Sequence, residues 1–545
     1  MLETEVDDPA ALAAWKERVQ AMREVLDWPP GEIVAARHAH AASLAIAAPA
    51  DRLLAATELN EWAWVGAANL CVPCAPGFPA PADFDSARHT LAAMTRAEAN
   101  PRLLEVLAQA REHGLPALVD EDQLSIGAGE GSACWPLQDL PRAPDWSRLH
   151  DVPTALVTGS NGKTTTVRLV AAMLEAHGLR AGFNCTDGVF VGGEQQVGGD
   201  YSGPTGARQV LRDPRVQAAV LETARGGLLR RGLAVEHAHA AIVTNVSADH
   251  FGEYGVDSLE DLADAKLVVA RAIGADGWLV LNADDAVLRA RAAGLRCQVA
   301  WFALAAEDAD WPGGRNAPSC RLLGGRLRLR WNEADHDLGP IDDFPLAMGG
   351  AARYNLANLA GAALVAAALG VPPATIAKVM ATFGAQRSDN PGRLERWESG
   401  GATVLLDYAH NPEGLQGLLA VAQGLRGPGG RLALLLGQAG NRDDGAITEL
   451  AWVAAAAQPA RVVLKDIEGY LRGREAGEVA ALLARQLVAA GVPPEALSVE
   501  LSEVAAGREL VSWAKPGDVV VLPVHNLQAR AELAAWLDSR GANPP

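Results

Sequence analysis

The spacing of apolar residues changes near residue 150. Before that point, apolar residues recur at helical spacing from Leu12 to Leu26, and Trp28-Pro29-Pro30 ends the run. Residues 52–64 and 91–113 predict two more helices, and the proline-rich stretch 72–81 predicts a loop. After residue 150, short continuous apolar runs alternate with amphipathic helices, which predicts a parallel sheet buried on both faces.

The apolar runs also divide the rest of the chain. Strands of the first sheet are expected at residues 155–157, 218–221, 241–243 and 278–281. A β-hairpin is predicted at 320–331 and a helix at 355–369. A second α/β unit starts near Asn390, with strands expected at 404–406, 432–436, 462–464 and 519–522. We therefore expect an α/β protein with an N-terminal accessory α+β domain (1–150), a central domain (151–388) and a C-terminal Rossmann-like domain (389–545).

The composition is that of a globular protein, with 49% hydrophobic and 21% charged residues among 545. The formal net charge of -19 makes a nucleic-acid partner improbable, because an acidic surface repels phosphate backbones. No run of about 18 uncharged apolar residues occurs, so no membrane span is expected. Six scattered cysteines and an acidic N-terminus predict a reducing cytoplasm, with Cys71 and Cys74 as a plain reduced pair rather than a metal site.

A glycine-rich turn joins the first predicted strand of the central domain to a helix. Its backbone N–H groups and the helix N-terminus can bind phosphate oxygens. The predicted nucleotide-binding residues are Gly159, Ser160, Asn161, Gly162, Lys163, Thr164 and Thr165. Lys163 can reach the β- and γ-phosphates, and the Thr164 hydroxyl can ligate Mg²⁺. The alternative is a tight turn without a ligand, and the chain has Val157 where the common P-loop pattern has glycine.

Polar residues follow the next two predicted strands. Glu222 ends the strand at 218–221, and a carboxylate at the carboxyl end of a parallel strand beside a P-loop can hold a metal ion. Asp249-His250 comes after the following strand, and Lys266 lies on a later helix. Taken singly, Glu222 fits a helix cap and Lys266 a solvated helix lysine. Their order behind the P-loop favours an active site.

Several separate motifs, in this order, resemble those of the Mur ligase family. They are GSNGKTTT (159–166), LETARGG (221–227), the segment 245–250 and LNADD (281–285). DYSGP (200–204), DYAHNP (407–412) and RGR (472–474) narrow the resemblance to the Mur-ligase-like half of cyanophycin synthetases. The resemblance covers about 152–525. The string PGRLE (391–395) is shared with Mur ligases and folylpolyglutamate synthetases and does not choose the substrate.

The resemblance implies an ATP-dependent, ADP-forming carboxylate–amine ligase. In such enzymes a carboxylate takes the γ-phosphoryl group of ATP, and an amine attacks the resulting acyl phosphate. It implies that Lys163 binds phosphates and that Thr164 and Glu222 hold one Mg²⁺. It also implies that His250 and a carbamylated Lys266 hold a second.

The same resemblance assigns residues on the far side of the nucleotide. Asn282 would contact the adenine, and Arg393 and Asp407 would approach the phosphates and the ribose when a mobile C-terminal domain closes. His410 and Asn411 lie on the same loop and would meet the nucleotide or the incoming amine. The hinge is expected at residues 388–392, where proline and glycine interrupt regular structure.

The sequence predicts the two substrates less specifically than it predicts the reaction. The resemblance implies an amino acid, with arginine as the first candidate, joined to an acidic small molecule or peptide. The region before Val152 is too short for the ATP-grasp domain that precedes these domains in cyanophycin synthetases, so we expect one bond per acceptor carboxylate. Whether the protein forms a homodimer is left open.

There are two alternative functions: a catalytically silent nucleotide-binding partner of another ligase, and a P-loop kinase or GTPase. The intact phosphate-binding and metal-binding residues favour an active ligase.

Overall fold

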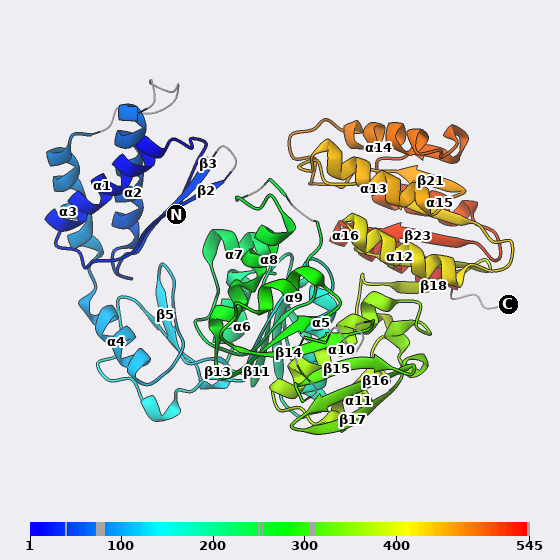
Figure 1. Cartoon of the computed structure of the whole chain (residues 1–545), viewed down its shortest axis with the longest axis horizontal. Coiled ribbons are helices and arrows are strands. Elements are labelled where there is room, and N and C mark those ends of the chain that lie inside the picture. Colours follow the sequence, from blue (N-terminus) through cyan, green and yellow to red (C-terminus); the bar gives the residue numbers. More distant parts are fainter. Residues whose placement is uncertain are drawn as a thin grey trace.

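The computed structural model describes residues 1–38, 41–71, 82–248, 251–252, 254–305, 311–312, 314 and 316–541. The loop predicted at 72–81, which contains Cys74, and the pair Asp249-His250 lie outside the described residues. Figure 1 shows the N-terminal helices at one end of the molecule, the central sheet in the middle and the C-terminal sheet at the other end. None of the helices in the described part of the chain has both the length and the apolar character needed to span a bilayer.

The N-terminal region has two small sheets, in the orders β1-β3-β2 and β4-β5-β6. Its elements are β1 (Leu2–Thr4), α1 (Pro9–Val25), β2 (Ile33–His38), β3 (Ala41–Ile46), α2 (Leu53–Cys71), α3 (Phe84–Glu98), α4 (Pro101–Glu112), β4 (Ala117–Val119), β5 (Gln123–Ile126) and β6 (Ala133–Pro136). The first two predicted helices are confirmed as α1 and α2. The single helix predicted at 91–113 is wrong. Asn100 caps α4 and Pro101 occupies its first turn, so α3 ends before them.

An eleven-stranded sheet forms the centre, in the order β10-β9-β8-β11-β7-β12-β13-β14-β15-β16-β17. Its elements are β7 (Thr154–Thr158), α5 (Lys163–Ala176), β8 (Ala181–Cys185), β9 (Gly188–Val191), β10 (Glu194–Gly198), α6 (Pro204–Arg212), β11 (Ala218–Glu222), α7 (Arg225–Arg231), β12 (Ala238–Val243), α8 (Leu259–Leu267), β13 (Ile273–Asn282), α9 (Ala286–Ala292), β14 (Gln298–Ala303), β15 (Ser319–Leu323), β16 (Arg326–Trp331), β17 (Ala334–Pro340), α10 (Arg353–Ala368) and α11 (Pro373–Met380). From β8 to β15 the neighbours are parallel, as predicted. The hairpin predicted at 320–331 is confirmed as β15 and β16, and it continues this sheet because β15 pairs with β14.

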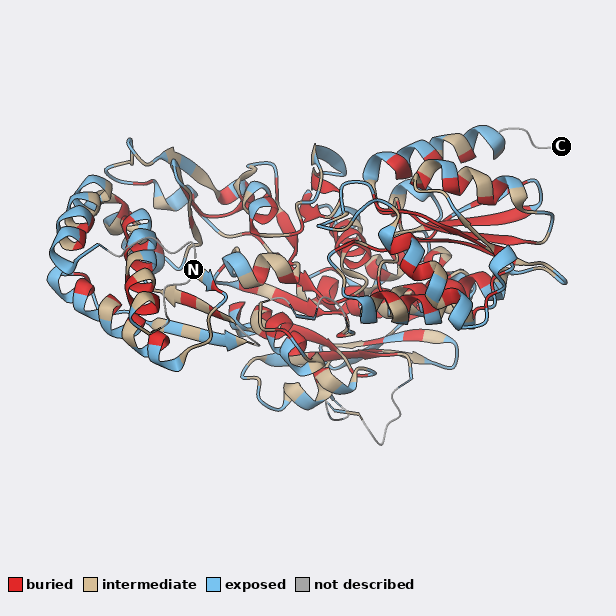
Figure 2. Cartoon of the chain, turned by 90° about the horizontal axis from the view of Figure 1, so that it is seen from above, coloured by how far each residue is buried: buried red, intermediate tan, exposed pale blue. Residues whose placement is uncertain are grey.

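Helices cover both faces of the central sheet. Alternating residues of a strand point to opposite faces, so Val157 of β7 packs with α5 and α10, while Leu156 packs with α6 and α8. Figure 2 shows the result, with buried strands between helices that are exposed on their outer sides. Burial on both faces is why these strands have continuous apolar sequences.

The C-terminal sheet has six strands in the order β18-β19-β23-β20-β21-β22. Its elements are β18 (Glu395–Ser399), β19 (Ala402–Asp407), α12 (Pro412–Leu425), β20 (Leu432–Leu436), α13 (Asp444–Ala456), β21 (Arg461–Leu464), α14 (Glu478–Ala489), β22 (Leu497–Val499), α15 (Glu503–Trp513), β23 (Val519–Pro523) and α16 (Leu527–Gly541). The four predicted strands are confirmed as β19, β20, β21 and β23, all parallel. Sequence reasoning missed the two edge strands, β18 and β22.

Candidate active site

One cavity of about 710 Å³ is lined by residues at the carboxyl ends of strands from both large sheets. The central sheet and its helices contribute Ser160, Asn161, Gly162, Lys163, Thr164, Thr165, Thr186, Asp200, Ser202, Glu222, Asn245 and Asn358, among others. The C-terminal part contributes Arg393, Asp407, Tyr408, His410, Glu413, Gln438, Asn441, Arg442, Tyr470, Arg472 and His525, among others. The carboxyl ends of parallel strands are where α/β proteins bind ligands.

The P-loop takes a conformation that needs glycine at Gly162. This residue has a φ of 82°, and a Cβ added there would lie 2.1 Å from the Asn358 side-chain oxygen. The ammonium of Lys163 donates to the carbonyl oxygens of Gly159 and Ser160, both at 3.0 Å. The loop therefore holds a positive charge above its own backbone, where phosphate oxygens would bind.

Thr164 and Glu222 form the buried floor of the cavity. The Thr164 hydroxyl donates to Oε2 of Glu222 at 2.9 Å. Burial raises the pKa of Glu222 to about 7, although Lys163 and the Thr164 hydroxyl act in the opposite direction. The other carboxylate oxygen, Oε1, is buried and has no hydrogen-bond partner among the described residues. A hydroxyl and a carboxylate with an unsatisfied oxygen fit Mg²⁺, which prefers oxygen ligands.

Arg393 reaches this floor from the C-terminal part of the chain. Its guanidinium donates to the hydroxyl of Thr186 at 2.9 Å and to that of Thr164 at 3.4 Å. The same group lies 4.3 Å above the ring of Tyr408, which supports it by a cation–π contact. Asp407 accepts the backbone N–H groups of Leu394 and Ala409, at 2.7 and 2.8 Å, and burial raises its pKa. Asp407 therefore fixes the backbone directly after Arg393 and directly after Tyr408.

Direct hydrogen bonds join the P-loop to the C-terminal part of the chain. Asn411 donates to Oδ1 of Asn161 at 3.0 Å, and Asn161 donates to Oε2 of Glu413 at 2.7 Å. Asn390 donates to the Thr165 hydroxyl at 3.1 Å. The two walls of the cavity are thus bonded to each other.

The structure brings most of the predicted site residues to this cavity. Those on its wall are Ser160, Asn161, Gly162, Lys163, Thr164, Thr165, Glu222, Arg393 and Asp407. Four others are not on the wall. Gly159 is not a lining residue, although its carbonyl oxygen accepts a hydrogen bond from Lys163. Asn282 is not on the wall, since its side chain donates to the Thr244 carbonyl oxygen at 3.3 Å and accepts from the Asp284 N–H at 3.0 Å. Lys266 is 4% exposed on α8 and is not a lining residue, and His250 is outside the described residues.

Two lining residues carried a signal that sequence reasoning missed. Thr186 follows β8, so it lies at the carboxyl end of a parallel strand beside β11, as Glu222 does. Asn358 is buried on α10, a helix that is otherwise mainly alanine and leucine, and it donates to Asn355 at 3.2 Å. A polar residue on an apolar helix near a P-loop indicates a ligand-facing position.

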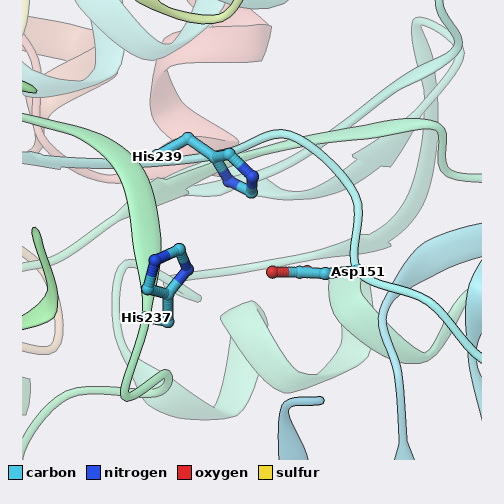
Figure 3. A group of neighbouring side chains, drawn as sticks. All are labelled: Asp151, His237 and His239. Carbon is cyan, nitrogen blue, oxygen red and sulfur yellow. The ribbon is translucent and has the colours of Figure 1, made fainter. Parts of the chain in front are cut away.

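A second group of ligand-type side chains lies away from the cavity. Potential ligand atoms of Asp151, His237 and His239 are all within 4.8 Å of one another, and Figure 3 shows the carboxylate directed toward the two rings. However, Nδ1 of His239 accepts the backbone N–H of Thr154 at 3.1 Å, so the neutral ring carries its proton on Nε2. The carboxylate of Asp151 accepts the Val152 N–H at 2.8 Å. Both bonds come from backbone N–H groups, and the one from Thr154 joins β7 to β12, so they favour a structural role for this group rather than a metal site.

Comparisons with known proteins agree with this architecture. The Mur ligase middle domain matches residues 157–366, and the Mur ligase, glutamate ligase domain matches residues 392–523. The cyanophycin synthetase of Synechocystis sp. is 35% identical over 410 residues, which are 71% of this chain and 45% of that protein. The chain therefore spans less than half the length of that relative.

One further relative and one solved structure are matched over more of their own length. The UDP-N-acetylmuramoyl-L-alanyl-D-glutamate--2,6-diaminopimelate ligase of Alkalilimnicola ehrlichii is 31% identical over 405 residues, covering 66% of this chain and 75% of that protein. The solved structure of E. coli FolC in complex with DHPP and ADP has a TM-score of 0.50 at 18% identity, and the match covers 71% of this chain and 89% of that one. The structural match shows a shared fold.

Proposed function

Because the chain belongs to the Mur ligase family, we propose that it is an ATP-dependent ligase that joins a carboxylate to the amine of an amino acid. A carboxylate oxygen attacks the γ-phosphorus of ATP and ADP leaves. The amine then attacks the acyl carbon, phosphate leaves, and the amine loses a proton. The observation that carries the proposal is the buried Thr164–Glu222 pair beside Lys163, with Arg393 above it.

The floor of the cavity would hold the metal ion. Thr164 and Glu222 would bind Mg²⁺, which neutralises phosphate charge when bound. Lys163 and Arg393 approach the same floor, so four groups can surround the γ-phosphate region. These residues position charge and take no covalent part.

We place a second metal ion at His250 and Lys266, as the family resemblance implies. Lys266 is buried on α8, and a carbamate on its amine would turn a cation into an oxygen-rich anion. Carbamylation adds carbon dioxide to the neutral amine and releases one proton. Mass spectrometry of the intact protein at neutral pH, with Lys266→Ala as the control, tests this assignment.

Closure of the C-terminal domain would protect the acyl phosphate from water. We propose domains at 1–150, 151–388 and 389–545, with a hinge at 388–392. Asn390 and Pro391 contact the central part, through the Thr165 hydroxyl at 3.1 Å and the Arg168 guanidinium at 3.2 Å. Such contacts next to a hinge can hold the closed arrangement, which excludes water during the reaction.

The wall of the cavity supports an amino acid as the amine substrate. Arg442 and Arg472 line its C-terminal side, and guanidinium groups bind carboxylates well. Asp200 and Glu413 also line it, and they supply carboxylates for a basic side chain. We therefore keep arginine as the first candidate for the amine and an acidic small molecule or peptide as the acceptor. Asn282 would act on the adenine side indirectly, through the turn that it stabilises by accepting the Asp284 N–H.

A phosphate-release screen tests the function. The purified chain is incubated with ATP, Mg²⁺, each amino acid and a set of acidic acceptors, and the products are identified by mass spectrometry. We expect ADP, phosphate and one amide product to appear together, and none of them with Lys163→Ala. Nucleotide binding without any amide product would instead favour a silent partner of another ligase. Long Asp–Arg polymer formed from free amino acids would refute a single ligation per acceptor carboxylate.

A further inference from the structure

A buried lysine lies behind the C-terminal wall of the cavity. Lys465 follows β21 and its side chain is fully buried. Its ammonium contacts the carboxylate of Glu503 and lies 3.1 Å from Nδ1 of His525. Burial lowers the pKa of Lys465, and a buried ammonium is tolerated only where it is paired and hydrogen-bonded. Lys465 does not line the cavity, so it touches no substrate there.

Glu503 ties this lysine to the segment after β23. It is the first residue of α15, and besides Lys465 its carboxylate accepts the backbone N–H groups of His525 and Asn526, both at 3.0 Å. Burial opposes ionisation, but the ammonium of Lys465 and the contacts with His525 together outweigh it and lower the pKa of Glu503. The pair therefore stays charged and fixes the backbone of His525.

The hydrogen-bond partners of His525 allow only one tautomer of its neutral ring. Nε2 lies 3.0 Å from the carbonyl oxygen of Ala409, which can only accept, so Nε2 carries the proton. Nδ1 then has a free electron pair and accepts from the ammonium of Lys465, which can only donate. Burial and the charge of Lys465 lower the pKa of His525 to about 4, in agreement with a neutral ring.

The bond from His525 to Ala409 acts on the loop that meets the nucleotide. Ala409 lies between Tyr408, which supports Arg393, and Asn411, which bonds to the P-loop. The Tyr408 ring also packs edge-on against His525, at 5.4 Å between centroids. The loop is therefore held by one ring, itself on the cavity wall, whose orientation depends on two buried charges that lie behind the wall.

We propose that Lys465, Glu503 and His525 form a positioning relay for the ligation reaction. The relay orients the loop at 408–411 so that Tyr408 places Arg393 over the metal floor and Asn411 reaches the P-loop. This inference rests on the proposed function. A purely structural ion pair would stabilise the C-terminal sheet and leave the chemistry of a folded variant unchanged.

Two substitutions of His525 separate these roles, because both keep the Lys465–Glu503 pair. His525→Gln can still donate to Ala409 from its amide nitrogen, whereas His525→Leu cannot. We expect His525→Leu to lower kcat about 10- to 100-fold, with the KM for ATP changed less than about threefold, because misplacement of a loop acts mainly on the reacting geometry. His525→Gln should recover to within about threefold of the wild-type kcat.

A charge pair at the amino ends of two strands of the same sheet, opposite to the carboxyl ends where Lys465 lies, provides the control. Arg431 bonds to the buried carboxylate of Asp518 at 2.6 Å, before β20 and β23 begin. Arg431→Met should lower the thermal midpoint and leave kcat unchanged. A wild-type kcat in folded His525→Leu, or no difference between the Leu and Gln variants, would overturn the relay.

Removing both charges together tests Lys465 itself. The double variant Lys465→Met, Glu503→Gln leaves no unpaired buried charge, so it should fold. If the two charges act only through His525, its loss of kcat should equal that of His525→Leu, and the triple variant should lose no more. Additive losses would show that Lys465 acts elsewhere and would overturn the relay.

A spectroscopic measurement keeps this inference separate from the proposed function. In the full chain labelled with ¹⁵N-histidine, the signal missing from His525→Gln is that of His525. We expect the neutral form with the proton on Nε2 throughout the range from about pH 5 to 8, since its pKa is about 4. Titration near 6.5, or a proton on Nδ1, would overturn the relay even if no ligation were found. Failure of the wild type to ligate, with this tautomer present, would instead refute the proposed function.

Discussion

Replacement of Glu222 by an uncharged residue is expected to raise the free energy of unfolding rather than lower it. Its carboxyl group is 1% exposed, one of its oxygens has no hydrogen-bond partner among the described residues, and burial raises its pKa from 4.5 to about 7. Glu222→Gln keeps the shape and resembles the protonated acid. We therefore expect this substitution to abolish ligation while stabilising the metal-free fold at slightly alkaline pH.

The magnitude follows from the pKa shift. The folded chain binds this proton more tightly than the unfolded chain does, so stability falls as the pH rises from about 4.5 toward 7. The shift is about 2.5 units, which corresponds to about 3 kcal/mol above pH 7. Near pH 4 the two proteins should have equal stability, and at about pH 8 the Gln variant should be more stable by about 3 kcal/mol.

Urea unfolding of the metal-free proteins at several pH values measures this difference. Glu413→Gln is the matched control, because Glu413 lines the same cavity but is exposed, and its substitution should give no gain that grows with pH. ATP should stabilise both proteins through the P-loop, and Mg²⁺ should add to that stabilisation more in the wild type than in Glu222→Gln, because the variant lacks the ionised carboxylate. A Gln variant that is less stable at pH 8, or a difference independent of pH, would refute the argument that Glu222 is a desolvated, poorly satisfied acid.

Three further substitutions have defined outcomes. Lys163→Ala should lower turnover at least about 10³-fold through lost charge stabilisation, and near wild-type amide formation would contradict its role. Lys266→Ala should be nearly inactive and partly rescued by small carboxylates, whereas full activity would exclude the proposed carbamate. Asp187→Asn should destabilise the fold by about 3–5 kcal/mol, measured by thermal unfolding, because it leaves the guanidinium groups of Arg168 and Arg530 buried without their shared carboxylate. An unchanged midpoint would show that these groups find other partners.

A continuous apolar sequence was the signal for the strands that were predicted, but it did not find every buried strand, since β8 and β14 inside the central sheet were not predicted. The strands found in advance, such as β7 and β20, are fully buried and have continuous apolar sequences. In the C-terminal sheet, the missed strands are at its two edges. β18 exposes alternate residues such as Arg396 and Glu398, and β22 has only three residues, so neither has an apolar run. The break between α3 and α4 did have a local signal, in Asn100-Pro101, which the helical spacing of the surrounding apolar residues obscured.

Site residues could be predicted where they end neighbouring parallel strands of one sheet. The P-loop and Glu222 end neighbouring parallel strands, so their meeting follows from topology once the strands are known. The bond between Asn161 and Asn411 spans 250 residues and depends on how two sheets dock, which no local pattern encodes. Asn282 and Lys266 were assigned by resemblance. In the structure, Asn282 accepts a hydrogen bond within a turn, and Lys266 is buried on α8.

The charge of the cavity explains how an acidic protein can bind a nucleotide. The chain carries a formal charge of -19, which would repel ATP from most of its surface. The cavity wall differs. Its basic residues are Lys163, Arg353, Arg393, Arg442 and Arg472, and its acidic residues are Asp200, Glu222, Asp407 and Glu413. The five basic residues outnumber the four acidic ones, and burial raises the pKa of Glu222 to about 7, so the wall has a positive excess before any metal ion binds. An anion is therefore attracted to the one described cavity where both sheets supply charged groups, and Mg²⁺ would balance Glu222 as it loses its proton.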